Sequence, residues 1–328
     1  MRVGVQHMRF MSRARPISEE IERTTDPGRR ERLELVLAAR EFAAASGLDV
    51  GGSYLKISDT TGLSTAYVVT AAYDDRLEPY NWSYPIIGKI PYRGYFDRED
   101  AERFGATLAE DGYDIHIVEA AGYSTLGWFD DPLPSGVLEY EPVALAELII
   151  HELVHQTLYV PGHIAFNETL ASAVAARLTV AFFEERGQTA EADEARERRE
   201  RWLVQSRYLD GLAANLVAYF EASRDLPRDE MLAGRRQIYL GAIERMSEIR
   251  LAPADPEPDL VDRMNNAVLL AVWRYRDRAD VIDAFLARHE SIPAALDALG
   301  AVVDGAEDPY TAVAAAPSAV HSPGQRTQ

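Results

Sequence analysis

The sequence predicts an α+β fold, with one small mixed sheet placed before a series of helices. Short runs of β-branched and aromatic residues, separated by turn residues, fill the chain between about residues 53 and 120, which is typical of strands. From residue 142 onward, apolar residues instead recur every three or four positions, the spacing of one face of a helix. Strands that precede a run of helices in this way indicate the α+β class.

The chain is expected to begin with a helical segment. Residues 29–46 carry apolar residues on one face, and Gly47 is placed to end the helix. We expect this helix to serve in packing. Strands are then expected over residues 67–70, 85–96 and 113–118, with a helix over residues 98–110 before the last of them.

Two helices joined by a short turn follow the predicted sheet. The first is expected over residues 143–160, because Pro142 has the backbone angle of a first helical turn and a Pro-Gly pair ends the apolar pattern. The second is expected to open at Asn167, a favourable N-cap residue, and to end near Gly187. Helices joined by so short a turn pack as neighbours.

The first helix of this pair carries the motif His-Glu-x-x-His. His151 and His155 are four residues apart, so on a helix they lie on one face and can bind the same metal ion. The turn can bring Glu168, in the second helix, toward His155. Two imidazoles and a carboxylate leave one position open to water, which is the pattern of a catalytic zinc site. We therefore predict one Zn²⁺ per chain, with His163 as the rival of Glu168 for the third ligand position.

Glu152 follows His151 directly and is not a ligand in this interpretation. Its expected role is that of a general base, which takes a proton from the zinc-activated water as that water attacks a carbonyl carbon, and passes the proton to the leaving amine. A pair of structural histidines is the alternative interpretation. Metal-dependent hydrolysis is favoured over it, because a strongly apolar helix is a costly place for an idle carboxylate.

Further residues are candidates for the same site. Tyr275 is a candidate donor to the oxyanion of the tetrahedral intermediate, and its alternative is a tyrosine of the core or rim. Segment 123–127 is a candidate for the sheet edge that pairs with an extended peptide, and its alternative is a turn followed by buried aromatic residues. The substrate-binding candidates of this segment are Tyr123, Ser124, Thr125 and Gly127.

Beyond Gly187 the chain is expected to be helical. Residues 191–201 are dense in both charge signs, as on a solvated helix surface. Asn265 and Asn266 lie inside an otherwise apolar pattern, so we expect them either to bond neighbouring helices or to line the cleft. Further helices are expected over residues 202–222, 229–250, 259–276 and 279–299.

These elements divide the chain into four predicted segments. They are an N-terminal helical segment over residues 1–47, a catalytic core over 48–187, a helical C-terminal part over 188–303 and a tail over 304–328. The tail is rich in alanine, proline, serine and glycine, and is expected to be disordered.

Longer stretches of the sequence are more specific than the His-Glu-x-x-His motif. They are residues 12–17, 92–96, 123–133, 151–160 and 166–168, together with 265–267, 269–270 and Tyr275. In these stretches, which span most of the chain, the sequence resembles the bacterial aminopeptidases of gluzincin type. The resemblance implies a zincin-like catalytic domain and a zinc-dependent peptidase, with His151, His155 and Glu168 as ligands and Glu152 as base. Better-studied gluzincins place more residues between the second histidine and the glutamate, and those of aminopeptidase type carry a Gly-x-Met-Glu-Asn strand that this sequence lacks.

Composition excludes several kinds of partner and chemistry. A net charge of −19 over 328 residues argues against nucleic acid and anionic membranes, which would repel the chain. Cysteine is absent, so disulfides, thiol catalysis and cysteine metal sites are excluded. The sequence has no transmembrane stretch and no apolar export signal at its start. We expect a cytoplasmic protein as the sequence is written, or an exported or lipid-anchored protein of the cell envelope if the true start lies upstream.

The sequence thus predicts a zinc-dependent peptidase that acts on peptide or protein substrates, and by resemblance an aminopeptidase. Two alternatives stay open. One is an endopeptidase that uses the same site, and the other is a metal-binding protein that recognises peptides without cutting them. The sequence makes no prediction of the oligomeric state.

Overall fold

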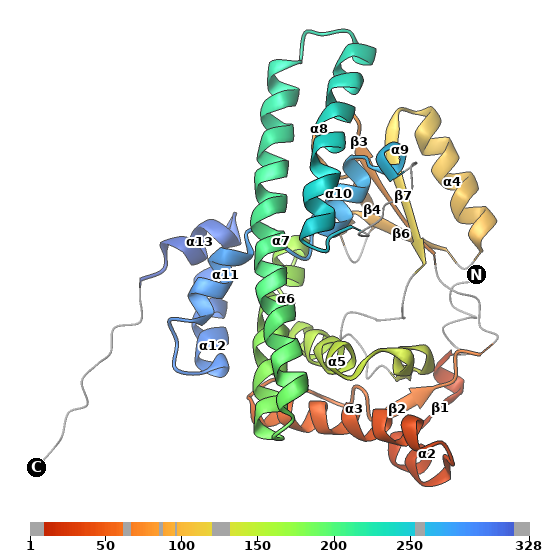
Figure 1. The fold of residues 1–328 in the computed structure, drawn as a ribbon, viewed down its shortest axis with the longest axis vertical. Helices are drawn as coiled ribbons and strands as arrows, with labels where there is room; N and C mark the ends of the chain where they lie inside the picture. The colour runs from red at the N-terminus through yellow and green to blue at the C-terminus, as the bar shows by residue number, and fades with distance from the viewer. Residues whose placement is uncertain are drawn as a thin grey trace, which may run out of the picture.

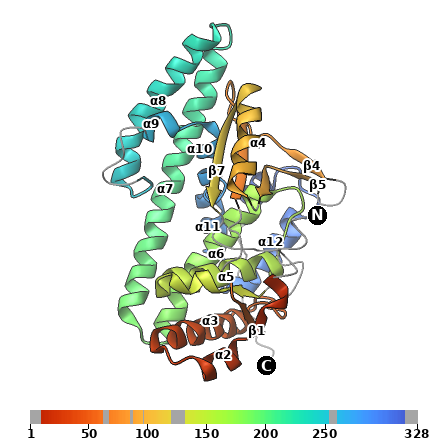
Figure 2. The ribbon, with the colours of Figure 1, turned by 90° about the vertical axis from the view of Figure 1, so that its right-hand side faces the viewer.

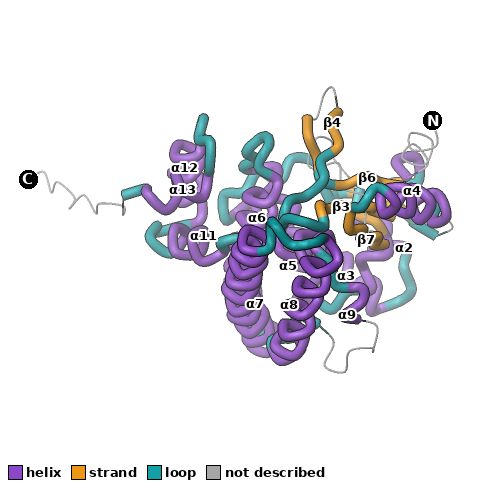
Figure 3. The backbone as a smooth tube through the Cα atoms, turned by 90° about the horizontal axis from the view of Figure 1, so that it is seen from above, coloured by secondary structure: helices purple, strands orange, loops and turns teal. Residues whose placement is uncertain are grey.

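The helices and strands form an α+β structure in which a sheet lies above a layer of helices (Figure 1). The computed structural model describes residues 10–61, 67–84, 88–95, 97–119, 132–252 and 260–317. Seen from above, the strands gather on one side of the molecule and the last three helices lie on the opposite side (Figure 3). The α+β class predicted from the sequence is therefore confirmed.

The main sheet has three strands in the order β6-β3-β7, and both pairings are antiparallel. Its strands are β3 (Tyr67–Tyr73), β6 (Tyr92–Tyr95) and β7 (Tyr113–Glu119). The prediction of one mixed sheet is wrong for these strands. The reason lies in the connection: the chain returns through α4 (Arg98–Glu110) so that β6 and β7 run the same way, but β3 lies between them and opposes both.

The described part of the expected strand over residues 85–96, which leaves out residues 85–87 and 96, is divided between two sheets. Its first part, β5 (Gly88–Ile90), pairs with β4 (Trp82–Tyr84) as a separate hairpin, and its second part is β6. Pro91 stands between them and has no N–H group to continue a ladder. A third sheet is mixed, and consists of β1 (Ala14–Pro16), β2 (Lys56–Ser58) and β8 (Leu133–Pro134).

Helix α4 covers the main sheet at close range. A Cβ atom at Gly105 would lie 3.1 Å from side-chain carbons of both Ile115 and Ile117 on β7, so the absence of a side chain lets the helix approach the strand. The α4 boundaries agree with the predicted helix over residues 98–110. Helix α10 (Asn266–Trp273) also contacts β3 and β7, which attaches the C-terminal part of the chain to the sheet.

The layer below the sheet contains α3 (Pro27–Ala45) and α5 (Pro142–Thr157), which contact each other (Figures 1 and 2). Both start with proline in the first turn, and Gly47 ends the α3 region with a φ of 84°, as the sequence predicts. Helix α5 packs in turn against α6 (Ile164–Glu185). Thus the two helices that carry the metal motif and Glu168 are neighbours.

Helix α6 begins three residues before the predicted start at Asn167, and its N-cap residue is His163. Asn167 has a different role. Its buried side chain accepts a hydrogen bond from the Val160 N–H group and donates one to the Val160 carbonyl, both at 2.8 Å. Two backbone groups of the α5–α6 turn are thereby satisfied away from water, so the turn is held in a single geometry. Gly187, with a φ of 67°, follows the C-terminus of α6 as predicted.

The helices beyond Gly187 differ from prediction in where they break. The predicted helix over 202–222 is part of one 34-residue helix, α7 (Thr189–Ala222), which pairs with α8 (Arg228–Glu248). The predicted helix over 259–276 is two helices, α9 (Leu260–Arg263) and α10, because the Asn265 side chain caps α10 at the Val268 N–H group. The predicted helix over 279–299 is likewise divided at Ser291, into α11 (Ala279–Leu286) and α12 (Ile292–Val303).

A further helix, α13 (Pro309–Ala315), lies within the tail that was expected to be disordered from residue 304. Its Tyr310 is buried, and the ring packs edge to face on Phe166 at a centroid distance of 5.1 Å. The apolar core formed by α3, α5 and α6 extends to α11, α12 and α13, and this burial explains why the segment is ordered.

Asn265 and Asn266 bond neighbouring elements, one of the two roles expected for them. Asn266 is fully buried, accepts a hydrogen bond from Tyr239 Oη at 2.8 Å and donates one to the Tyr73 carbonyl at 2.8 Å. Asn265 donates to the Ile115 carbonyl at 3.0 Å. These bonds connect α8, α10 and the main sheet. None of the described helices combines the length and apolar character that crossing a membrane requires.

Candidate metal centre

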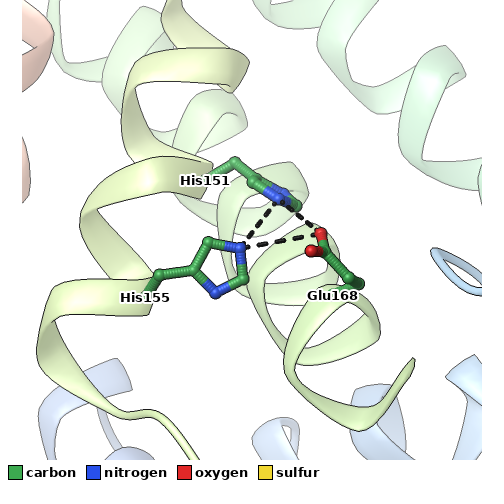
Figure 4. Close-up of side chains that lie close together, drawn as sticks. All are labelled: His151, His155 and Glu168. Atoms are coloured by element: carbon green, nitrogen blue, oxygen red, sulfur yellow. Dashed lines mark hydrogen bonds and ion pairs between the residues drawn. The ribbon is translucent and has the colours of Figure 1, made fainter. Parts of the chain in front are cut away.

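His151, His155 and Glu168 converge between α5 and α6 (Figure 4). The Nε2 atoms of the two histidines are 3.3 Å apart. Glu168 Oε2 lies 3.3 Å from His151 Nε2 and 3.6 Å from His155 Nε2. The helix brings the histidines to one face, and the turn held by Asn167 aligns the start of α6 with that face. The three residues form a group that could hold a metal ion.

The distances within this group agree with tetrahedral coordination. Ligand atoms about 2.0–2.1 Å from a tetrahedral zinc lie roughly 3.3–3.4 Å from one another, close to the three observed separations of 3.3, 3.3 and 3.6 Å. Two neutral imidazoles and one carboxylate are also the donor types that zinc prefers. The residues present therefore fit a zinc ion with one coordination position left for another ligand.

Electrostatics keep Glu168 ionised. Burial alone would raise the pKa of its carboxyl, but hydrogen bonds from His151 and His155 and their positive charge outweigh burial and lower the pKa to about 2. For His151, burial acts to lower the pKa, yet the hydrogen bond to Glu168 and the charges of Glu168 and Glu152 raise it. Glu168 is thus an anion at neutral pH, and protons would compete with a metal ion for the His151 imidazole.

The outer nitrogens of the two histidines have different surroundings. His151 Nδ1 lies 3.5 Å from Ser172 Oγ on α6, so the serine can orient this ring with Nε2 directed at the group. His155 is 5 % exposed, and its Nδ1 atom is buried without a hydrogen-bond partner among the described residues. His155 is therefore oriented by packing within α5 and by the group itself.

Glu152 and Tyr275 both lie close to the group. Glu152 is half-buried on α5, and its charge raises the pKa of His151 and of Tyr275. Tyr275 lies in the turn after α10, with its ring centroid 6.2 Å from that of His151. Partial burial of its phenol, followed by the charges of Glu168 and Glu152, raises the pKa of Tyr275 well above its ordinary value. The structure thus brings this candidate to the site from more than 100 residues along the chain.

Two other tyrosines and an arginine surround the group and were not predicted. Burial, and then the charge of Glu168, raises the pKa of both Tyr92 and Tyr159. The Arg274 guanidinium lies 5.7 Å from the centroid of the Tyr92 ring. A signal for Tyr92 was present in the sequence, because residues 92–96 are one of the stretches that carry the family resemblance. Tyr159 lies in another of these stretches, residues 151–160, whereas Arg274 lies in none of them.

Several predicted residues are not placed in the group. His163, the rival ligand, is the N-cap residue of α6 and is not among the three clustered residues. The substrate-binding candidates Tyr123, Ser124, Thr125 and Gly127 lie outside the described residues.

Fold and site together define an α+β protein with a candidate metal centre between two packed helices, next to a carboxylate and a tyrosine. The chain belongs to the family described as "Putative aminopeptidase", which it matches over residues 1–301. This membership indicates a peptidase, and so a hydrolase acting on peptides. Neither a search of curated proteins nor a search of solved structures found a match.

The choice between Glu168 and His163 gives a direct prediction. Glu168→Gln is expected to weaken zinc binding by more than about 100-fold, because a ligand contributes at least as much as outer-shell partners, whose loss costs about 10–100-fold. His163→Ala is expected to keep one zinc per chain. Elemental analysis after dialysis measures both. Zinc retained by the Glu168 variant and lost by the His163 variant would reverse the assignment.

Proposed function

We propose that this protein is a zinc-dependent peptidase with a zincin-like catalytic centre, and that it acts as an aminopeptidase. The observation that supports this most strongly is the geometry of His151, His155 and Glu168, with Glu152 beside them. The proposed catalytic core over residues 48–187 contains all four. Tyr275, from the proposed helical C-terminal part, completes the site.

Each residue has one task in the proposed reaction. His151, His155 and Glu168 would hold the zinc ion, which when bound supplies a Lewis acid that polarises the scissile carbonyl and makes water more acidic. Glu152 takes a proton from the attacking water and delivers it to the leaving amine. Its half-buried position next to His151 keeps it within the same site without making it a ligand.

Tyr275 is proposed to stabilise the oxyanion. A phenol is protonated at neutral pH, and burial raises the pKa of Tyr275 further. The hydroxyl can therefore donate a hydrogen bond to the oxygen that becomes negative as the tetrahedral intermediate forms. Its ring is not packed away in the core, since 39 % of the residue is exposed. This exposure supports a position at the rim of the site from which substrate is reached.

The function is tested by metal content together with cleavage of a mixed peptide library. One zinc per chain and release of N-terminal residues only from peptides with free amino termini are expected. Cleavage of acetyl-blocked peptides at internal bonds would make the protein an endopeptidase instead. Bound zinc without any cleavage would favour a non-catalytic peptide-recognition protein, and treatment with a chelator is expected to abolish the activity reversibly.

Tyr275→Phe isolates the oxyanion role. We expect kcat to fall by about 10²–10³-fold, as on removal of one oxyanion donor, with little change in KM or zinc content. Tyr113→Phe is the matched control, since that ring packs against Tyr73 and Tyr80 on the main sheet and should leave kcat unchanged. A Tyr275 variant with unaltered kcat would show that another group stabilises the oxyanion.

A further inference from the structure

A cavity of about 400 Å³ lies at the first turn of α6, the helix that carries Glu168. One wall is the first turn of α6, with Ile164 and Ala165. These two residues lie three and four positions before Glu168, and therefore on the same face of the helix. The other walls are α10 with the turn after it, strand β5, and the residues on either side of the β4–β5 hairpin. The cavity is thus about one helical turn from a proposed metal ligand.

The charged residues that line this cavity are Lys89, Arg274 and Asp277. The Asp277 carboxylate is already paired, with its Oδ1 atom 3.2 Å from Arg278 Nε. Lys89 and Arg274 form no hydrogen bond or ion pair through their side chains with any of the described residues. The chain has 53 acidic residues against 34 arginines and lysines, so unpaired cations that face one cavity are unexpected. Two of the three charged side chains that line the cavity are therefore cations without an ion-pair partner among the described residues.

Contacts hold Arg274 next to the metal centre. Thr169, the residue after Glu168, donates a side-chain hydrogen bond to the Arg274 carbonyl at 3.3 Å. Tyr92 lies close enough to both charges that Glu168 raises its pKa and Arg274 lowers it. The Arg274 guanidinium rests near the Tyr92 ring at 5.7 Å from the centroid, a contact that leaves its N–H groups available to an anion.

We propose that this cavity is a substrate subsite for a carboxylate, bound by Arg274 and Lys89, so that the enzyme prefers peptides with an acidic group near the scissile bond. The proposal rests on the proposed peptidase function and adds the substrate class. Arginine binds carboxylates with two parallel hydrogen bonds, and Lys89 adds a second charge from the β5 strand. The apolar lining from Pro91, Leu270 and Trp273 suits the aliphatic stem of an acidic side chain or the end of a peptide.

Binding without turnover tests the subsite separately from catalysis. The zinc-loaded Glu152→Gln protein is titrated by calorimetry with tetrapeptides. One set consists of C-terminal amides in which glutamate replaces glutamine at each position in turn, with the unsubstituted neutral amide as reference. A further peptide is the neutral sequence with a free C-terminal carboxylate. At least one acidic peptide is expected to bind about 10- to 100-fold more tightly than the neutral amide, as for a hydrogen bond to a charged group. The position of the glutamate, or the free acid, identifies the source of the carboxylate.

Arg274→Gln, introduced into the Glu152→Gln protein, is expected to remove most of this preference for acidic peptides. The neutral amide should bind with unchanged affinity. Lys89→Gln, at an exposed side chain, is expected to reduce the preference by a smaller factor. It is the variant to use if the Arg274 variant does not fold. Arg23→Gln changes the charge equally at an exposed site on α2 (Ile17–Arg23) and should leave the preference intact.

Two results would overturn the subsite. The first is that acidic and neutral peptides bind equally well, or that neither binds. The second is that the preference for acidic peptides persists in both the Arg274 and the Lys89 variants. Hydrolysis of the same peptides by the unsubstituted protein tests the proposed function. Preferential binding of acidic peptides without cleavage would reject the peptidase function and retain the subsite. Cleavage without any preference for acidic peptides would reject the subsite and retain the peptidase function.

Discussion

Replacing Glu152 by glutamine is expected to lower kcat/KM for peptide hydrolysis by about 10²–10⁴-fold, the range for loss of a general base, while zinc content stays at one per chain. The amide is nearly isosteric with the carboxylate but cannot take up a proton. Because Glu152 is not one of the three clustered residues, metal binding should not change. Activity assays, elemental analysis and a pH profile measured on the same preparation provide the test.

The matched control is Glu147→Gln. Glu147 is five residues earlier on α5, and its carboxylate is paired with Arg198 at 2.7 Å. This substitution therefore removes the same charge from the same helix without changing the proposed base. Its kcat/KM should stay within a few-fold of the unsubstituted value. A Glu152 variant as active as this control would remove Glu152 from the mechanism, and a Glu152 variant without zinc would reassign it as a ligand.

The helix pair that carries the metal motif is predictable because its signals are local. The spacing of His151 and His155 places them on one face of any helix, and Pro142 and Gly187 mark the two ends. The start of α6 was misplaced because Asn167 is a good N-cap residue, and the sequence pattern does not show that its amide is required at Val160. Tertiary contacts decide which of its two possible roles the Asn167 side chain takes.

Long-range contacts account for most of what the sequence did not reveal. Tyr92 and Arg274 are more than 70 residues from Glu168 in either direction, and contacts between distant parts of the chain position them, among them the pairing of β6 with β3 and the packing of α10 on the sheet. The break between α9 and α10 at Asn265, in contrast, has a local cause. Its capping signal was present, but the apolar spacing around it continues across the break, and the two patterns predict different structures.

Replacing His155 by alanine is expected to abolish zinc binding at micromolar metal and, with it, peptide hydrolysis. His155 supplies one of only two imidazoles in the group, and its ring is buried, so no exposed side chain can replace it. A ligand lost from a three-residue site should weaken binding by well over the roughly 100-fold seen for outer-shell partners. Titration with zinc and an indicator dye measures the affinity directly.

His163→Ala is the control for this substitution, because it removes an imidazole from the adjoining turn but leaves the three clustered residues unchanged. The zinc affinity of this control should also depend on pH. In the control, zinc affinity is expected to fall as the pH is lowered through the raised pKa of His151, since protons then compete with zinc for that imidazole. Full zinc binding by the His155 variant would show that the metal, if it binds, is held elsewhere, and the proposed catalytic centre would fail with it.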